Sequence, residues 1–357
     1  MSAEKHLFSI YRDLLPLFPD DLHLARPLIQ MLQQAGRRRA AADLALHMAR
    51  RMQSAGRYSE ELGFLAICRQ LEHPDREAIK DMESMARIMV QSGGMEGEQE
   101  PGRVFSLIEQ LSDLEARDFL LQGSYLSVER GRAVVAQGEV SQSFFLIVRG
   151  SMDVELETGG NKLLLANLKA GDYFGEFACI YRIPRSATVR AHEDARLLRF
   201  SDRAIHDLIE RSPIAGERLM QVVQRRMVQS LTFEHPAFAE LAADDRLWLA
   251  ESSTVREYQA GEFVCQDCAG DDWLIMIHGR QEWVVDLKPA GAVAPHTMVY
   301  GGSRFLRREG TMIRAVGHTL VCDAPPAIFA SFMQAYAGFE RWVKEQKAEP
   351  ASGSAAG

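Results

Sequence analysis

One short segment, residues 173–191, contains side chains whose types and spacing suit a small ligand with a phosphate and a sugar. It reads YFGEFACIYRIPRSATVRA. The guanidinium of Arg185 can form charge-assisted hydrogen bonds with phosphate oxygens, and free N–H groups at the start of a helical turn attract the same anion. Glu176 can accept a hydrogen bond from a sugar hydroxyl. The segment therefore predicts a binding site for a sugar phosphate.

The other residues of the segment complete this predicted site. Gly175 allows the backbone to approach the ligand closely, because a Cβ would obstruct it. The helical turn that follows Glu176 directs its N–H groups into the pocket. Ser186 offers the phosphate a hydroxyl and an N–H, and Ala187 offers an N–H. The alternative interpretation is that Glu176 and Arg185 form a structural ion pair on a barrel loop.

The whole string resembles the phosphate-binding cassette of cyclic nucleotide-binding domains. The form is that of the catabolite activator protein and of the regulatory subunits of cAMP-dependent protein kinase. The resemblance covers about residues 105–232 and includes QGE at 137–139 and FLIVRG at 145–150. It implies a sensor that catalyses no reaction. The implied ligand-binding residues are Phe174, Gly175, Glu176, Phe177, Ala178, Arg185, Ser186, Ala187 and Val189.

The same resemblance bears on the purine and on the choice of ligand. Family members cover the purine with a long C-terminal helix, and residues 225–232 take that place here. Ser230 or Thr232 is implied to bond the adenine amine, from the same chain or from the other subunit of a homodimer. Ser186 stands where cGMP-selective members often carry threonine, which favours cAMP. Receptors for cGMP or a cyclic dinucleotide are the alternatives, and no metal is expected.

The chain of 357 residues is too long for one ordinary hydrophobic core, so several domains are expected. We expect a multidomain α+β architecture, in which a helical N-terminal region precedes two β jelly-roll barrels with flanking helices. The expected divisions are a helical domain at 1–92, a linker at 93–102, a cyclic nucleotide-binding domain at 103–233, a degenerate copy of it at 236–345 and a disordered tail at 346–357.

The N-terminal region shows helical periodicity. Apolar residues recur at helical spacing, and Ala-Gly-Arg junctions at 35–37 and 55–57 separate helices of similar length. This pattern resembles helix hairpins of the tetratricopeptide kind, and a small helical bundle is an equally good interpretation. One helix is expected at 27–36, with Pro27 in its first turn, where the missing N–H costs nothing.

Short apolar runs separated by Gly, Asn or Asp residues predict the strands of a jelly-roll barrel. The predicted strands are 124–128, 133–136, 144–148, 152–156, 163–166 and 195–200, followed by helices at 202–211 and 214–231. A second barrel is expected because 260–264, 272–279 and 312–315 resemble 130–134, 143–150 and 188–191. A helix at 328–344 ends this second copy.

The second copy lacks the chemistry of the first. Gly301-Gly302-Ser303-Arg304 takes the place of residues 174–177, so the carboxylate for the ribose is missing. No Arg-Ser-Ala sequence precedes Met312. Arg304, Arg307 and Arg308 are predicted to form a solvated basic loop. We therefore expect one working nucleotide pocket in the chain.

Bulk properties exclude several classes of protein. The formal charge of −8 argues against a general nucleic-acid binder, and no apolar run approaches the roughly 20 residues that span a bilayer. Five cysteines favour a reduced cytoplasmic protein over a disulfide scaffold. Cys265 and Cys268 have the spacing of a metal or redox pair, but no second pair accompanies them, so ordinary cysteines are favoured.

Three functional hypotheses follow. The first is a cytoplasmic cAMP sensor that relays occupancy to a protein partner through the N-terminal helices or the degenerate barrel. The second is a transcription regulator like the catabolite activator protein, which requires a helix-turn-helix after the nucleotide-binding domain. Since residues 236–345 are predicted to form a barrel, DNA binding is not expected. The third is a structural protein with a vestigial cassette. No residues suggest an enzyme.

Overall fold

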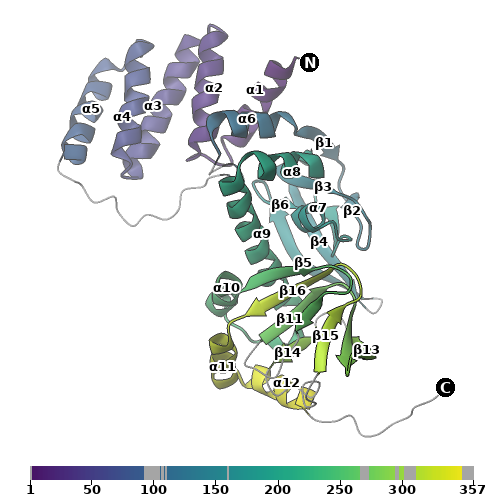
Figure 1. The fold of residues 1–357 in the computed structure, drawn as a ribbon. Helices are drawn as coiled ribbons and strands as arrows, with labels where there is room; N and C mark the ends of the chain where they lie inside the picture. The colour runs from purple at the N-terminus through teal and green to yellow at the C-terminus, as the bar shows by residue number, and fades with distance from the viewer. Residues whose placement is uncertain are drawn as a thin grey trace. The chain divides into compact units, whose positions relative to one another are not determined.

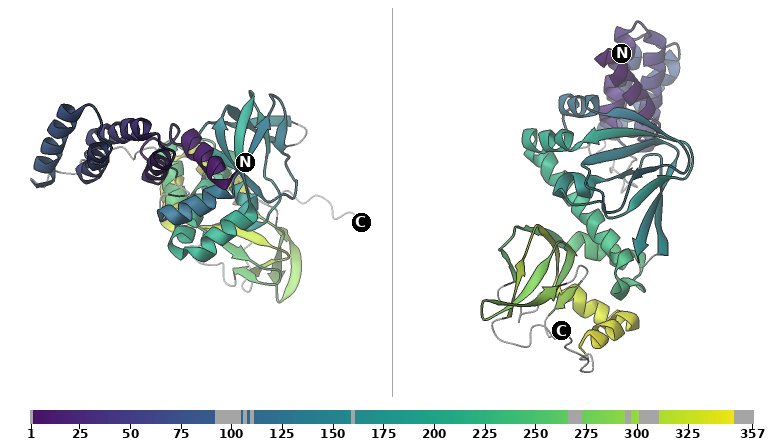
Figure 2. Two further views of the ribbon diagram at one scale, coloured as in Figure 1. Left: turned by 90° about the horizontal axis from the view of Figure 1, so that it is seen from above. Right: turned by 90° about the vertical axis from the view of Figure 1, so that its right-hand side faces the viewer.

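The computed structural model describes residues 2–91, 105, 108, 111–158, 161–265, 273–293, 297–300 and 311–347. The chain forms two compact units, Met1–Leu219 and Met220–Gly357. The boundary between the units falls inside one continuous helix, α9 (Pro213–Glu234). Figures 1 and 2 show a helical region followed by two regions rich in strands, which is the expected multidomain α+β architecture.

The helical region consists of consecutive helices that pack each against the next. Small side chains of α3 (Ala41, Ala42, Ala45 and Ala49) are buried and let its neighbours approach closely. The linker expected at 93–102 lies outside the described residues. The helices are α1 (Ala3–Leu14), α2 (Leu22–Gln34), α3 (Arg38–Ser54), α4 (Tyr58–Gln70) and α5 (Arg76–Gln91).

The expectation that Pro27 begins its helix is wrong. α2 begins five residues earlier, at Leu22, and Pro27 lies inside it. The helix begins there because the Asp21 carboxylate accepts a hydrogen bond from the His23 N–H at 2.9 Å, as an N-cap does. The second Asp21 oxygen accepts from the Phe105 N–H at 3.0 Å. These two bonds hold a carboxylate that is 1% exposed.

The first barrel is built from two antiparallel four-stranded sheets, in the orders β1-β8-β3-β6 and β2-β7-β4-β5. Its strands are β1 (Ser124–Val128), β2 (Ala133–Val135), β3 (Ser143–Arg149), β4 (Ser151–Thr158), β5 (Asn161–Lys169), β6 (Tyr173–Phe174), β7 (Thr188–Ala191) and β8 (Ala195–Ser201). Its helices are α6 (Asp113–Leu121), α7 (Glu176–Tyr181), α8 (Asp202–Arg211) and the start of α9. The predicted strands coincide with these to within a few residues.

Apolar side chains from both sheets fill the first barrel. Phe145, Ile147 and Leu197 face Val189 and Met152 in one buried cluster. The helix α6 begins with a capping box, in which Ser112 and Glu115 bond each other's backbone. Its Phe119 ring stacks on Phe200 of β8 with centroids 4.6 Å apart. This stack joins α6 to the barrel.

The N-terminal helices also contact the first barrel directly. The Tyr125 hydroxyl of β1 donates to the Asp13 carboxylate at 2.9 Å. Arg196 of β8 reaches the same carboxylate at 3.3 Å and lies over the Tyr125 ring at 3.9 Å. His6 bonds the Gly123 carbonyl at 2.7 Å. Helix α1 is therefore fixed to the edge of the barrel by polar contacts.

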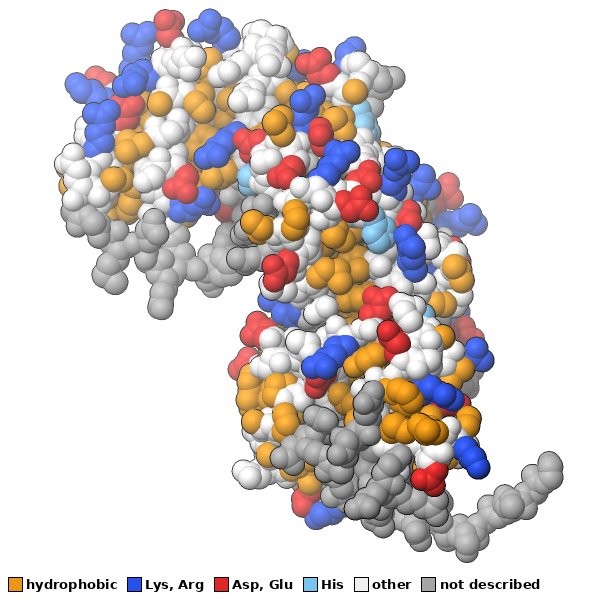
Figure 3. Space-filling model, in the orientation of Figure 1, with side chains coloured by type: hydrophobic (Ala, Val, Ile, Leu, Met, Phe, Trp, Pro, Cys, Tyr) orange, Lys and Arg blue, Asp and Glu red, His pale blue; other side chains and the backbone are white. Residues whose placement is uncertain are grey.

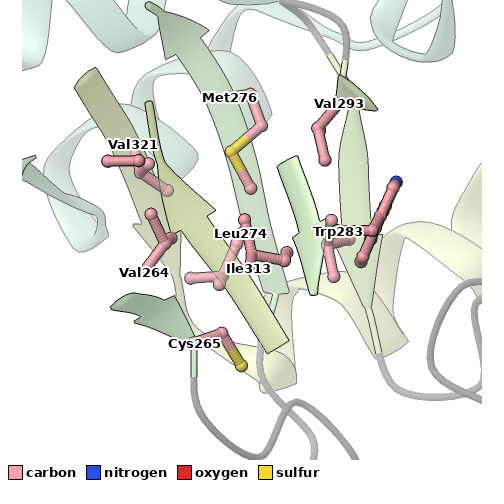
Figure 4. Close-up of a cluster of buried hydrophobic side chains, with 10 residues drawn as sticks. Val264, Cys265, Leu274, Met276, Trp283, Val293, Ile313 and Val321 are labelled. Carbon is pink, nitrogen blue, oxygen red and sulfur yellow. The ribbon is translucent and has the colours of Figure 1, made fainter. Parts of the chain in front are cut away.

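The second unit contains two antiparallel sheets, β9-β16-β11-β14 and β10-β15-β12-β13. Position by position, this is the strand order of the first barrel, as the internal repeat predicts. Side chains of both sheets meet in one buried cluster (Figure 4). The elements are the end of α9, η1 (Pro236–Phe238), α10 (Ala243–Ser252), β9 (Thr254–Tyr258), β10 (Phe263–Cys265), β11 (Trp273–His278), β12 (Gln281–Val285), β13 (Lys288–Val293), β14 (Met298–Tyr300), β15 (Thr311–Ala315), β16 (Thr319–Ala324), α11 (Pro326–Ala335) and α12 (Ala337–Lys347).

The single helix expected at 328–344 is instead two helices. Tyr336 is extended, with φ −122° and ψ 106°, and separates α11 from α12. Its hydroxyl donates to the Asp245 carboxylate and accepts from the Ala242 N–H at 3.1 Å. The Glu240 carboxylate accepts from the Gly338 N–H at 2.9 Å, which satisfies the first turn of α12. The expected tail from 348 onward lies outside the described residues.

The cysteines divide into two groups. Cys68, Cys179 and Cys322 are free and buried. Cys265 is disulfide-bonded, so the expectation of ordinary reduced cysteines is wrong at this position. Cys268 lies outside the described residues.

One carboxyl group of the helical region is buried without compensation. Glu61 of α4 is 0% exposed. Neither of its carboxylate oxygens has a hydrogen-bond partner within the described part of the chain. Burial raises the pKa of Glu61 from 4.5 to about 7. The folded helices therefore hold this proton more tightly than the unfolded chain does.

This burial predicts that the helical region loses stability as the pH rises. The neutral acid fits the folded state, so stability is greatest below pH 4.5, the unfolded pKa, and falls as the pH rises through about 7. Relative to Glu61→Gln, we expect the wild type to lose up to about 3 kcal/mol by pH 8. Hydrogen exchange of α4 amides, compared between the proteins at each pH, measures this difference.

The matched control is Glu77→Gln on α5, where the side chain is exposed. This variant should follow the wild type at every pH. Equal protection of α4 in the wild type and in Glu61→Gln from pH 5 to pH 8 would contradict the prediction.

Candidate functional site

The predicted cassette lies where the chain passes from one sheet of the first barrel to the other. β6 pairs antiparallel with β3, with Phe174 opposite Phe145, and the two rings stack at 5.1 Å. The short helix α7 follows, and the chain then enters β7 of the second sheet. The cassette is therefore anchored at both ends by paired strands, with its helical turn between them.

Gly175 is required here for two separate reasons. Its φ of +87° is left-handed, which side chains with a Cβ rarely adopt. A Cβ at this position would also lie 2.5 Å from Nη1 of Arg185 and 2.9 Å from the Ser143 carbonyl oxygen. Gly175 precedes α7, and no side chain caps that helix.

The Arg185 side chain is 4% exposed and is held by neutral oxygens. Nε donates to the Ser141 hydroxyl at 3.0 Å. Nη1 donates to the Gly175 carbonyl at 2.9 Å, and Nη2 donates to the Ser143 carbonyl at 2.6 Å. Three of the five N–H groups of the guanidinium thus donate to neutral oxygens. The guanidinium is fixed while keeping its positive charge.

The Arg185 backbone is also paired. Its N–H donates to the Glu139 carbonyl at 3.0 Å, and its carbonyl accepts from Gly138 at 2.8 Å. The two family-like turns, at 137–139 and at 185–187, are therefore neighbours in space. Glu139 and Glu176 both carry negative charge close enough to act on Arg185. Burial lowers the pKa of Arg185, and the charge of Glu139, followed by smaller contributions that include Glu176, opposes that shift.

The remaining cassette residues alternate between buried and accessible positions. Arg185, Ala187 and Val189 are buried, whereas Ser186 is exposed. Val189 belongs to the apolar cluster of the barrel. On the other side of the turn, Phe174, Glu176 and Ala178 are buried, and Phe177 is half-buried. The bond between Arg185 and Gly175 brings the two halves of the cassette together.

The two residues expected to contact the purine lie in the second unit. Both are on α9, where Ser230 is half-buried and Thr232 is 0% exposed. The Thr232 hydroxyl donates to the Gln229 carbonyl at 2.7 Å. Their contact with a nucleotide stays a prediction.

Sequence reasoning missed two residues of the site, Ser141 and Ser143. Ser141 contributes a hydroxyl, for which a Ser just before β3 is a weak sequence signal. Ser143 contributes only its backbone carbonyl, for which no side-chain signal exists.

The corresponding loop of the second barrel, 301–310, lies outside the described residues. Among the residues that are described, no group of three or more His, Cys, Asp or Glu side chains could hold a metal ion.

No helix in the described ranges is long and apolar enough to cross a membrane.

Parts of the chain are similar to known proteins. Residues 125–212 match the family model described as "Cyclic nucleotide-binding domain". The chain is 38% identical over 115 residues to a cAMP-dependent protein kinase regulatory subunit of Mycosarcoma maydis, covering 31% of this chain and 22% of that protein. It is 28% identical over 168 residues to the subunit of Schizosaccharomyces pombe, covering 44% of this chain and 39% of that protein. The chain thus spans less than half the length of these relatives.

Solved structures are similar to this chain only with low TM-scores and low sequence identity. The regulatory domain of Toxoplasma gondii PKA with cAMP is 17% identical with a TM-score of 0.31, covering 67% of this chain and 91% of that chain. The catabolite activator protein of Thermus thermophilus is 23% identical with a TM-score of 0.30, covering 36% and 69%. These two likenesses carry no argument about ligand or mechanism. The family match and the strand order identify residues 125–212 as a domain of the cyclic nucleotide-binding family.

Proposed function

We propose that the chain is a non-enzymatic sensor that binds a cyclic mononucleotide, cAMP, in the cassette of the first barrel. The observation that carries this proposal is the burial and the hydrogen bonding of the Arg185 side chain. Its charge is buried and fixed by neutral acceptors beside a helical turn that no side chain caps. A buried guanidinium with unused N–H groups is suited to a phosphate. The family of residues 125–212 supports the same ligand class.

The ligand would fill the cassette in one orientation. Its phosphodiester would lie against Arg185 and the N–H groups of Ser186 and Ala187. Its ribose 2′-hydroxyl would donate to Glu176, which is 6% exposed. The exocyclic phosphate oxygens would then use the Arg185 N–H groups that form no hydrogen bond within the described part of the chain.

The choice of cAMP is the finer part of the proposal. Ser186 is exposed on the cassette and lacks the methyl group of the threonine that often accompanies cGMP selectivity. The matched relatives of Mycosarcoma maydis and Schizosaccharomyces pombe are named for dependence on cAMP. Both observations favour adenine. The cover over the purine would come from Ser230 or Thr232 of α9, in this chain or in the second copy of a homodimer.

Occupancy would be passed on to a protein partner in the cytoplasm. The partner would dock on the N-terminal tetratricopeptide-like helices or on the second barrel. Ligand binding can change the partner's affinity only by the difference between its affinities for the two states. α9 is suited to this role, because it begins in the nucleotide-binding unit and ends in the other.

A DNA-binding role is less well supported. The described residues after α9 form two antiparallel sheets, in the part of the chain where a helix-turn-helix would follow in the rival hypothesis. On the face of the molecule in Figure 3, basic and acidic side chains are interspersed. The formal charge of −8 also opposes attraction to a polyanion.

Calorimetric titration of the whole chain with cAMP, cGMP and cyclic di-GMP tests the proposed function. We expect one site per chain, with cAMP bound most tightly. Arg185→Ala should weaken cAMP binding by roughly 10- to 100-fold, since a charge-assisted bond contributes about 1.5–3 kcal/mol. Arg182→Ala is the matched control, because Arg182 carries the same charge on the same loop but is exposed.

Two results would contradict the proposal. One is the absence of heat with all three nucleotides. The other is equal cAMP affinity in the wild type and in Arg185→Ala, which would place the ligand elsewhere.

The space around Gly175 gives a second prediction. Gly175→Ala combines a left-handed φ with a Cβ against Nη1 of Arg185. Gly131→Ala has a similar φ of +80° but nothing within 4 Å of its Cβ. Each substitution should lower stability by about 1–2 kcal/mol through backbone strain. Only Gly175→Ala should also displace Arg185 and weaken cAMP binding more than about 10-fold.

Thermal unfolding and calorimetry on both variants separate strain from displacement. If Gly131→Ala weakens cAMP binding as much as Gly175→Ala does, the loss comes from general strain in the barrel and the steric explanation is wrong.

A further inference from the structure

A tight turn between β2 and β3, residues 136–139, contacts the backbone of Arg185. The Gly138 N–H donates to the Arg185 carbonyl at 2.8 Å, and the Arg185 N–H donates to the Glu139 carbonyl at 3.0 Å. The turn is closed by Glu139, whose carboxylate accepts from the Ala136 N–H at 3.1 Å and whose N–H donates to the Ala136 carbonyl at 3.0 Å. The position of Arg185 in the cassette therefore depends on the position of this turn.

Gln137 joins this turn to two strands of the sheet that contains β4 and β7. Its side-chain N–H donates to the Glu157 carbonyl at 3.2 Å, and its side-chain oxygen accepts from the Glu157 N–H at 2.7 Å. The backbone N–H of Gln137 donates to the Thr188 hydroxyl at 3.0 Å. Glu157 belongs to β4 and Thr188 begins β7. One residue of the turn thus bonds both strands.

The Gln137 side chain also takes a place in the sheet that the cassette would otherwise fill. β4 and β7 pair antiparallel, and the pairing ends at Glu155 and Thr188. Continuing this register would put Ser186 opposite Glu157, but the Glu157 backbone bonds the Gln137 side chain instead. The Ser186 N–H forms no hydrogen bond within the described part of the chain. This N–H therefore remains available to an anion.

We propose that Gln137 is a positioning residue for the nucleotide site, which rests on the function proposed above for the cassette. Its side-chain amide fixes the turn against β4, and the turn fixes the backbone of Arg185. Loss of the amide would loosen the turn and let Ser186 pair with Glu157, which would use an N–H that the phosphate needs. Gln137 and Glu157 are exposed, so water can satisfy the backbone groups that are released, and the barrel itself should remain folded.

Hydrogen exchange of the full chain without ligand tests the positioning directly. Gln137→Met removes both amide bonds and keeps the length of the side chain. The Arg185 N–H should then exchange about 10-fold faster than in the wild type, because its acceptor on Glu139 is less well held. The Ile147 N–H, which donates to the Asp172 carbonyl at 2.9 Å, is the internal reference and should not change. An unchanged rate at Arg185, or an equal acceleration at Ile147, would overturn the proposal.

Calorimetry with cAMP tests the consequence for binding. Gln137→Met should weaken cAMP binding about 5- to 10-fold, the effect of roughly one lost neutral hydrogen bond. Asn167→Leu is the matched control, because Asn167 is an exposed amide of β5 that donates to the Asp153 carboxylate of β4 at 2.7 Å. The control removes a side-chain amide bond from the same pair of strands without touching the turn, and it should bind cAMP as the wild type does.

Two outcomes of this titration separate the role of Gln137 from the proposed function. If the wild type binds no cyclic nucleotide, the proposed function is wrong, and a role of Gln137 in nucleotide binding is excluded with it. If the wild type binds cAMP and Gln137→Met binds it equally well, only the role of Gln137 is excluded. The same holds if Asn167→Leu weakens binding as much as Gln137→Met does.

Discussion

The buried guanidinium of Arg185 is the interaction on which the cassette depends. It joins the start of α7, the start of β3 and the loop before β3, through Gly175, Ser143 and Ser141. Its own backbone pairs with the turn at Gly138 and Glu139. Burying a charge is costly unless hydrogen bonds replace the lost water. The protein therefore meets that cost with neutral acceptors.

The two barrels share a strand order and turn glycines but differ in the residues of the cassette. Gly150 and Gly279 occupy corresponding places after β3 and β11, and both have left-handed φ, +87° and +98°. In each case a Cβ would collide with a backbone carbonyl, that of Asp194 or of His318. The strand orders also agree. The cassette sequence does not, since residues 301–304 lack a glutamate. Packing thus requires a glycine in both barrels, whereas the glutamate of the first cassette has no counterpart in residues 301–304.

Local patterns were sufficient to predict most of the fold. β1 and α8 begin and end at the predicted residues, because alternation and capping are properties of adjacent side chains. The error in the last helix came from contacts between distant residues, whereas the error at Pro27 came from a local N-cap at Asp21. Tyr336 interrupts the last helix through its bonds to Asp245 and Ala242, which lie 91 and 94 positions earlier. In the cassette, Gly175 and Arg185 were predictable from their types, but the Ser143 carbonyl that holds Arg185 is a backbone group that any residue provides.

A second guanidinium gives the end of α9 a defined attachment within the second unit. Arg246 of α10 donates to the Thr232 carbonyl, to Phe238 at 2.6 Å and to Leu241 at 3.1 Å. The last carbonyls of a helix lack partners within that helix, so Arg246 supplies the donor that the end of α9 needs. Because the same planar group also binds η1, the end of α9 and η1 must shift together. A helix that begins in the first unit thus ends at a defined attachment within the second.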